Sequence, residues 1–292
     1  KRHFHGDNES PKMLLEVFKE HNKKYRELLN KDVVLGTVLR YERTARYLEE
    51  FMKVKYHFSD IPLKSINLEF VKEFEHFIKI EKGCAQNATV KYLKNFKKII
   101  RHALSNKWID GDPFAEIHFR QTASNREFLT EEELNKLIEK DFTIPRMEVV
   151  RDIFVFCSLT GLAFTDVQHL TPEHIFRDMD GSLWIRKTRE KTDNMCNIPL
   201  LDLPLKLIQK YQNHPECIRK GVVMPVPCNQ RMNSYLKEIA DACGIQKTLT
   251  THIARHTFAC LAIANKVSTE SIAKMLGHTD IRTTKIYARV LD

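Results

Sequence analysis

The sequence lacks the features that mark several large classes of protein. It contains no run of 18 or more apolar residues, and its first twelve residues have no apolar signal-peptide core, so it predicts neither a membrane-spanning nor a secreted chain. Only nine glycines are present and none belongs to a GxGxxG or Walker-type loop, which argues against a nucleotide-binding loop. No cluster of carboxylates is spaced to hold paired magnesium ions.

Cysteine usage is also informative. The seven cysteines are odd in number and scattered, and no two of them form a CxxC pair. This pattern predicts neither a disulfide framework nor a zinc ribbon, and it fits a reducing cytoplasm. The chain opens on a lysine instead of a methionine, so we expect a processed or excised chain with a further N-terminal part.

Positive charge is concentrated in the first half of the chain. Residues 1–120 contain 24 basic and 17 acidic residues, whereas residues 121–292 contain 23 and 21. A basic domain of this kind favours a polyanionic partner, and nucleic acid is the commonest one.

The N-terminal part shows the apolar periodicity of amphipathic helices. Apolar residues recur at helical spacing over about 13–30, 34–53, 70–78 and 90–104, with basic residues on the other faces. We therefore predict a tail at residues 1–12 and a basic helical bundle at 13–112.

A break separates this bundle from a second domain. Asp110-Gly111-Asp112-Pro113 ends the last helix, and we predict a linker at 113–127 and a second domain at 128–292. Thr130 and Glu133 form a capping box, and residues 175–200 have the pattern of a β-hairpin or three-stranded sheet. The predicted fold is mainly α, with two domains and one small sheet in the second.

The segment His252-Ile253-Ala-Arg255-His256 carries the strongest chemical signal. His252 and Arg255 share one helix face, where a guanidinium and an imidazole can bind one phosphate. A capped helix with surface charges is the alternative. Zinc binding by His252 and His256 is disfavoured, because Ile253 stands where zinc proteases have their glutamate.

A second cluster follows near the C-terminus. Gly277 ends a helix and leaves His278 at a turn, and Tyr287 lies nine residues further on. Each residue alone has an ordinary structural explanation, but the order His-x-x-Arg-His, Leu-Gly-His, Tyr is a specific pattern.

With these motifs the sequence resembles the tyrosine site-specific recombinases, the phage integrase family. The resemblance covers roughly residues 12–292 and includes TGLA at 160–163 and KTDNMCNIPL at 191–200. Within the family it resembles the integrases of conjugative transposons and related mobile elements. The resemblance implies a core-DNA-binding helical domain followed by a catalytic domain.

The resemblance also implies residue roles. Tyr287 would be the nucleophile on a DNA phosphodiester, and Arg255, His252 and His278 would stabilise the charge of the phosphorane. Lys191 matches the family's hairpin lysine, the general acid for the 5′ oxygen, with Lys187 as a competitor in the sequence.

One family residue is missing. The first catalytic arginine of the family normally stands at position 163, which is alanine here. We expect Arg151, on the preceding helix, to replace it, with a surface ion pair as its alternative role and with Arg186 and Arg189 as weaker substitutes. Asp166 is expected to orient its neighbours.

The function implied is integration and excision of a mobile element through a covalent 3′-phosphotyrosine, with no metal and no cofactor. The partners are double-stranded DNA, a homotetramer in the synaptic complex or a monomer without DNA, and a host DNA-bending protein as a candidate accessory. Alternatives are a recombinase that resolves chromosome or plasmid dimers and a catalytically inactive DNA-binding homologue. Five residues are predicted to bind DNA: Arg40, Arg43, Lys91, Lys94 and Lys98.

Overall fold

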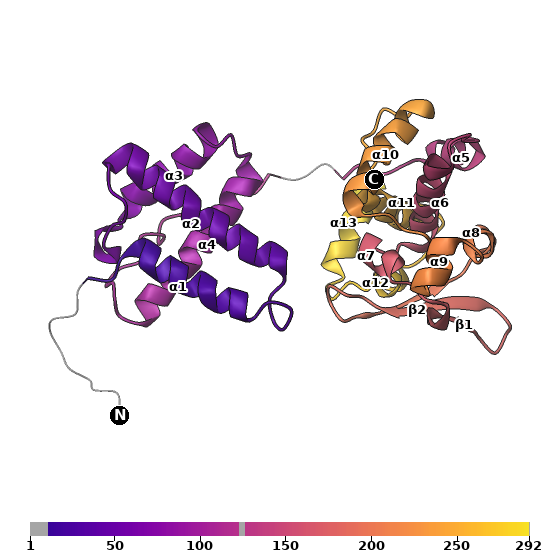
Figure 1. The fold of residues 1–292 in the computed structure, drawn as a ribbon, viewed down its shortest axis with the longest axis horizontal. Helices are drawn as coiled ribbons and strands as arrows, with labels where there is room; N and C mark the ends of the chain where they lie inside the picture. The colour runs from indigo at the N-terminus through magenta and orange to yellow at the C-terminus, as the bar shows by residue number, and fades with distance from the viewer. Residues whose placement is uncertain (1–10, 123–125, 292) are drawn as a thin grey trace. The chain divides into compact units, whose positions relative to one another are not determined.

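The computed structural model describes residues 11–122 and 126–291, and the chain divides into two compact units between residues 124 and 125. The predicted fold class is confirmed, because both units are mainly helical and one small sheet lies in the second (Figure 1). No helix in the described ranges is long and apolar enough to cross a membrane.

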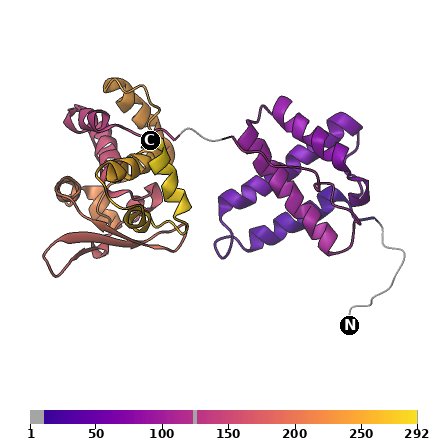
Figure 2. The same cartoon turned by 180° about the vertical axis from the view of Figure 1, so that it is seen from behind.

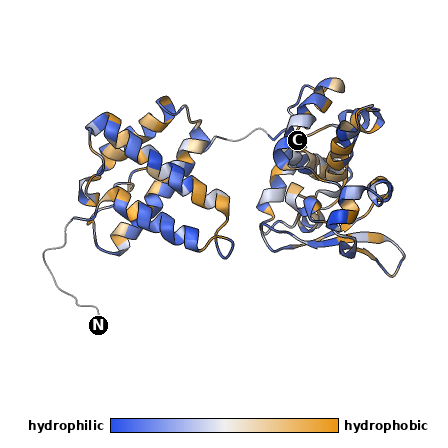
Figure 3. Ribbon diagram, in the orientation of Figure 1, coloured by the Kyte–Doolittle hydropathy of each residue, from blue (hydrophilic) through white to orange (hydrophobic). Residues whose placement is uncertain are grey.

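The first unit is a bundle of four helices that bury aromatic rings. Phe51 of α2 packs against Phe74 of α3 with ring centroids 5.5 Å apart, and Phe74 packs against Phe96 of α4 at 5.7 Å. Figure 3 shows apolar and polar residues on different faces of these helices, as the periodicity predicts. The elements are α1 (Leu14–Glu27), α2 (Leu35–Tyr56), the 3-10 helix η1 (Leu63–Ser65), α3 (Leu68–Ile80) and α4 (Gln86–Ser105).

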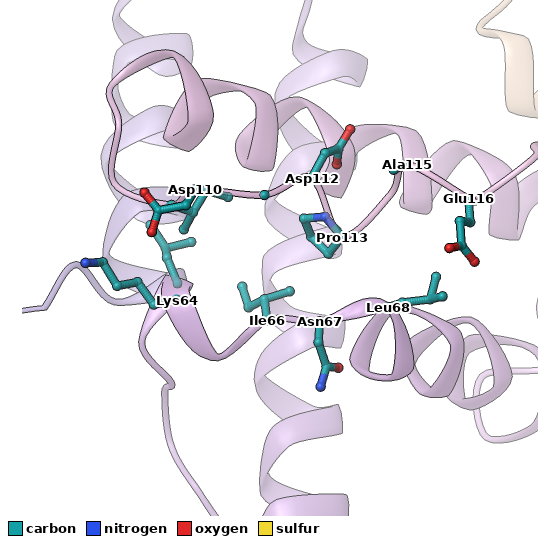
Figure 4. A pocket seen from close by; sticks show the side chains of 12 residues that line it. Lys64, Ile66, Asn67, Leu68, Asp110, Asp112, Pro113, Ala115 and Glu116 are labelled. Carbon is teal, nitrogen blue, oxygen red and sulfur yellow. The ribbon is translucent and has the colours of Figure 1, made fainter.

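The first unit extends into the segment that we predicted as a linker. Phe114 is completely buried and its ring lies 5.2 Å from that of Phe96, edge to face. The chain around it also forms one wall of a cavity of about 390 Å³, opposite η1 and the start of α3 (Figure 4). None of the predicted site residues lines this cavity.

The second unit is built around α6, most of whose residues are buried. It packs against α5, α8, α10 and α11, so its apolar sequence fits a central helix. The predicted capping box is confirmed, since the side chains of Thr130 and Glu133 bond each other's backbone N–H at the start of α5. The helices are α5 (Glu131–Glu139), α6 (Pro145–Thr160), α7 (Phe164–Gln168), η2 (Pro172–His174), α8 (Asp202–Tyr211), α9 (Pro215–Lys220), α10 (Asn229–Ala242), α11 (Thr251–Ala264), α12 (Thr269–Leu276) and α13 (Arg282–Leu291).

The sheet has three antiparallel strands in the order β1 (Ile175–Arg177), β2 (Leu183–Thr188) and β3 (Met195–Pro199). Ile185 pairs with Ile198, and both are buried, which fixes the register of β2 against β3. The loop between these strands, residues 189–194, packs near the end of α12. Helix α13, yellow in Figures 1 and 2, packs on α11 and α12.

Candidate active site

Arg255 lies at the centre of the predicted site. It projects from α11 and is 4% exposed, and its guanidinium donates hydrogen bonds to the carbonyls of Gly161 and Leu276. These carbonyls belong to the ends of α6 and α12, so Arg255 joins three helices. Burial, together with the neighbouring charge of Arg189, lowers its pKa to about 10, which leaves it charged at neutral pH.

A second guanidinium lies beside Arg255, and it belongs to Arg189 of the β2–β3 loop. Its Nε is 3.4 Å from Oδ2 of Asp166, a carboxylate that is 1% exposed. The charge of Arg189 contributes to lowering the pKa of Arg255, His278 and His252. The loop therefore brings an arginine to the region where Ala163 leaves the family's first arginine missing.

Arg151 does not take this place, so the prediction for this residue is wrong. Its Nη1 donates to the carbonyls of Leu137, Ile138 and Lys140, and its Nε lies 2.6 Å from Asp152. Arg151 also precedes Gly161 by ten residues along α6, a rise of about 15 Å. The Nη1 and Nε groups of Arg151 are thus bound at the C-terminal end of α5 and at Asp152.

His278 stands at the turn that Gly277 creates. Gly277 has φ +58°, and the Nδ1 of His278 is 2.7 Å from the hydroxyl of Thr284 on α13. Burial and then the charges of Arg255 and Arg189 lower the pKa of His278 to about 4, so the imidazole is neutral. His252 is more exposed, and partial burial with the charge of Arg255 also lowers its pKa.

Gly277 admits no side chain, and this gives a first prediction. A Cβ there would lie 2.6 Å from Cδ of Arg189 and 2.7 Å from Sγ of Cys196. We expect Gly277→Ala to lower the free energy of unfolding by about 1–3 kcal/mol more than the control Gly244→Ala, which has a similar φ but open space. Urea denaturation measures both, and equal losses would show that Arg189 is not held against Gly277.

Tyr287 is buried among other site residues. It is 3% exposed, its ring lies 5.3 Å from that of His256, and the guanidinium carbon of Arg126 is 5.8 Å from the ring centre. Burial raises the pKa of the phenol, while the charges of Arg255 and Arg126 oppose that rise. The phenol is therefore protonated at neutral pH and must lose its proton during attack.

The structure separates the two candidate lysines. Lys187 is 6% exposed and its Nζ donates to the carbonyl of His169 at 3.1 Å, which occupies it in the fold. Lys191 is exposed in the β2–β3 loop, and its charge contributes to lowering the pKa of His252. Asn194 ties this loop to α12 by donating to the carbonyl of Gly277 at 3.1 Å. The geometry favours Lys191 over Lys187 as the general acid.

Asp166 lies where it can orient its neighbours. Its Oδ1 accepts a hydrogen bond from the backbone N–H of Glu190 at 3.1 Å, and its other oxygen faces Arg189. Both contacts hold the start of the β2–β3 loop. Sequence reasoning missed Arg126 and the packing of His256 on Tyr287, because neither follows from residue spacing.

The predicted DNA-binding residues lie on two helices of the first unit. Arg40 and Arg43 on α2, and Lys91 and Lys94 on α4, are exposed. Lys98 differs, because its Nζ donates to the hydroxyl of Tyr25 and lies 4.8 Å from the centre of that ring. Within the described ranges no group of three or more His, Cys, Asp or Glu is placed to hold a metal ion.

Comparison with known proteins agrees with this geometry. The model of the phage integrase SAM-like domain matches residues 13–121, and that of the phage integrase family matches residues 127–292. The chain belongs to the phage integrase family. It is a tyrosine recombinase, an enzyme that cuts and rejoins DNA.

Relatives of this recombinase align along almost all of its length. Tyrosine recombinase XerD of Listeria monocytogenes serotype 4b (strain F2365) is 24% identical over 279 residues, which cover 90% of this chain and 91% of XerD. The Tn1549 transposon integrase in complex with a circular intermediate DNA is 18% identical, with a TM-score of 0.71 and 94% of each chain covered. A lambda integrase tetramer bound to a Holliday junction is 16% identical, with a TM-score of 0.73 and coverage of 96% and 78%.

Proposed function

We propose that Tyr287 attacks a DNA phosphodiester and forms a covalent 3′-phosphotyrosine, with Arg255, Arg189, His252 and His278 around the reacting phosphate. The observation that carries this proposal is that Arg255, Arg189 and His278 gather at Gly277, with the phenol of Tyr287 within reach of the charge of Arg255. Charged donors aimed at the nonbridging oxygens stabilise the additional charge of the phosphorane.

The remaining step is protonation of the departing 5′ oxygen. Lys191 fits this role because its ammonium is exposed in the β2–β3 loop, whereas that of Lys187 is bound to a carbonyl. Breaking the bond between phosphorus and the 5′ oxygen while Tyr287 bonds to phosphorus conserves the number of ester bonds. The reaction therefore needs neither ATP nor another cofactor, and rejoining is its reverse.

For the biological role we propose integration and excision of a mobile element by strand exchange in a homotetramer on DNA, in the cytoplasm. The likeness to the Tn1549 integrase bound to a circular intermediate supports it, and the lambda tetramer on a Holliday junction supports the assembly. Resolution of chromosome or plasmid dimers is the second candidate, because XerD aligns over 90% of this chain.

Covalent capture on genomic DNA tests both levels of this proposal. Fragments of the genome that encodes this chain would be nicked lightly, incubated with the protein, and recovered and sequenced only if attached through a denaturant-resistant bond. Captured sites that flank the gene would support a mobile element, and one distant chromosomal locus would support dimer resolution. Binding without any capture would favour the catalytically inactive alternative.

The basic faces of α2 and α4 give a second prediction, on salt dependence. Each phosphate contact that is removed lowers the slope of log K against log salt by about 0.9. We expect Lys91→Ala to lower the slope by about this amount, and Lys98→Met to lower it less because Lys98 is already bound to Tyr25. Fluorescence anisotropy with a captured duplex at several salt concentrations measures it. Equal slopes for Lys91→Ala and the unchanged protein would remove Lys91 from the DNA interface.

A further inference from the structure

A short segment at the start of the second unit is bound to the helix that carries Arg255. We call residues 126–129 the junction segment. The carbonyl of Phe128 accepts a hydrogen bond from Nζ of Lys247 at 2.9 Å, and the N–H of Leu129 donates to the hydroxyl of Thr257 at 2.9 Å. Leu129 is fully buried. The segment therefore has a defined position on α11.

The junction segment also contacts the surroundings of the nucleophile through His256. The Nδ1 of His256 lies 3.3 Å from the carbonyl of Glu127, and only a protonated nitrogen can donate to that oxygen. Burial lowers the pKa of His256 to about 4, so the imidazole is neutral, and among the described residues its buried Nε2 has no hydrogen-bond partner. The ring packs edge-on against Tyr287 at 5.3 Å.

Arg126 is the first described residue of this segment, and it lies over the same phenol ring. Its guanidinium carbon is 5.8 Å from the ring centre of Tyr287. Its positive charge acts on the site residues around it and contributes to lowering the pKa of His252 and His278.

We propose that Arg126 is a positioning residue for the nucleophile: it holds the Tyr287 ring by a cation–π contact and stabilises the phenolate that forms during attack. This inference rests on the proposed role of Tyr287. A cation over an aromatic ring changes an equilibrium by about three- to thirtyfold. A cation beside a phenol also favours its deprotonated form, so loss of Arg126 raises the pKa of the phenol.

The groups that face Tyr287 keep their charge states between about pH 6 and pH 9, so the effect of Arg126 on the phenol can be measured in this window. From α11 it faces Arg255, which remains charged, His256, which is neutral, and Cys260, whose pKa burial raises to about 11. Helix α12 contributes the apolar side chains Ile272 and Leu276 to the same cluster. A rate that rises with pH in this window therefore reports the loss of the phenolic proton.

The kinetic test compares Arg126→Ala, Arg126→Lys and a control variant. The substrate is a captured DNA site, made as a nicked duplex with a bridging 5′ sulfur at the scissile phosphate. A thiolate leaves without a general acid, so the pH dependence of the attachment rate no longer includes the titration of a general acid such as Lys191. Arg146→Ala is the matched control, since Arg146 lies 5.4 Å over the ring of Tyr235. Rates of covalent attachment are measured from pH 6 to pH 9.

We expect Arg126→Ala to slow attachment by about three- to thirtyfold throughout pH 6 to pH 9, because the phenol titrates above this window in both proteins and the whole rising limb moves to higher pH. Arg126→Lys keeps a cation and should recover most of the rate, and Arg146→Ala should match the unchanged protein. No deficit, or a deficit in Arg126→Lys as large as that in Arg126→Ala, would overturn the inference.

A second measurement does not depend on catalysis. Tyrosine labelled with carbon-13 at Cζ reports the titration of each phenol by NMR, and comparison with Tyr287→Phe assigns the signal. We expect Arg126→Ala to raise the pKa of Tyr287 in the DNA-free protein. An unchanged pKa overturns the inference even if Tyr287 is the nucleophile, whereas a raised pKa without any covalent attachment would overturn only the proposed function.

Discussion

Replacing Tyr287 by phenylalanine is expected to abolish covalent attachment to DNA, by a factor on the order of 10⁴ or more, because no other group supplies the attacking oxygen. Binding to the same duplex should change by less than about threefold, since a single hydroxyl is removed. A nicked duplex of a captured site, run on a denaturing gel, measures attachment, and anisotropy measures binding.

Tyr235→Phe is the matched control for this prediction. Tyr235 also lies beside an arginine in the second unit, but it belongs to α10 and not to α13, the helix that carries Tyr287. We expect it to attach DNA at the rate of the unchanged protein. Persistent attachment by Tyr287→Phe would contradict the mechanism, and mass spectrometry of the linked peptide would then identify the actual nucleophile.

Much of the fold is predictable from local signals in the sequence. Helices of the first unit repeat apolar residues with a period near 3.6, and the Thr130–Glu133 pair marks the start of α5 through its own side chains. The predicted linker includes residues that pack on the first unit, because residues 114–127 have no periodicity while Phe114 is buried in the core and Ile117 and Phe119 pack against it. Isolated apolar residues after a turn give no signal of where they pack.

The site was predictable only where a motif carries it. Tyr287, Arg255 and His278 follow from their order along the chain, and the structure brings them together. The choice between Arg151 and Arg189 depends on which carbonyls and carboxylates each guanidinium reaches after folding, and sequence spacing contains no such information. The role of Arg126 is harder still to predict from the sequence, since its contact with Tyr287 joins residues 161 positions apart.

Arg189 and Arg151 have different roles, the first in catalysis and the second in stability, so lysine substitutions of the two residues should have opposite effects. Arg189→Lys keeps a positive charge beside the buried carboxylate of Asp166, so the free energy of unfolding should fall by well under the roughly 3–5 kcal/mol that the loss of one partner of a buried ion pair costs. Attachment should nevertheless fall by about 10²-fold, because lysine cannot present the planar fork that binds two phosphate oxygens.

Arg151→Lys should show the opposite pattern. One ammonium cannot both reach the three carbonyls at the end of α5 and pair with Asp152, so unfolding should become easier by about 2–3 kcal/mol. The attachment rate per folded molecule should stay within about twofold of the unchanged protein, since the guanidinium lies about ten residues along α6 from the Gly161 carbonyl.

A modified DNA substrate distinguishes a direct contact between Arg189 and the phosphate from an indirect effect of Arg189 on the site. If the guanidinium of Arg189 neutralises a nonbridging oxygen, replacing that oxygen by a methyl group removes the negative charge that the guanidinium neutralises. The deficit of Arg189→Lys should then shrink severalfold on a methylphosphonate duplex, while the deficit of Tyr287→Phe remains complete. A deficit of the same size on both duplexes would place Arg189 outside the phosphate contact and leave it the role of holding the β2–β3 loop through Asp166.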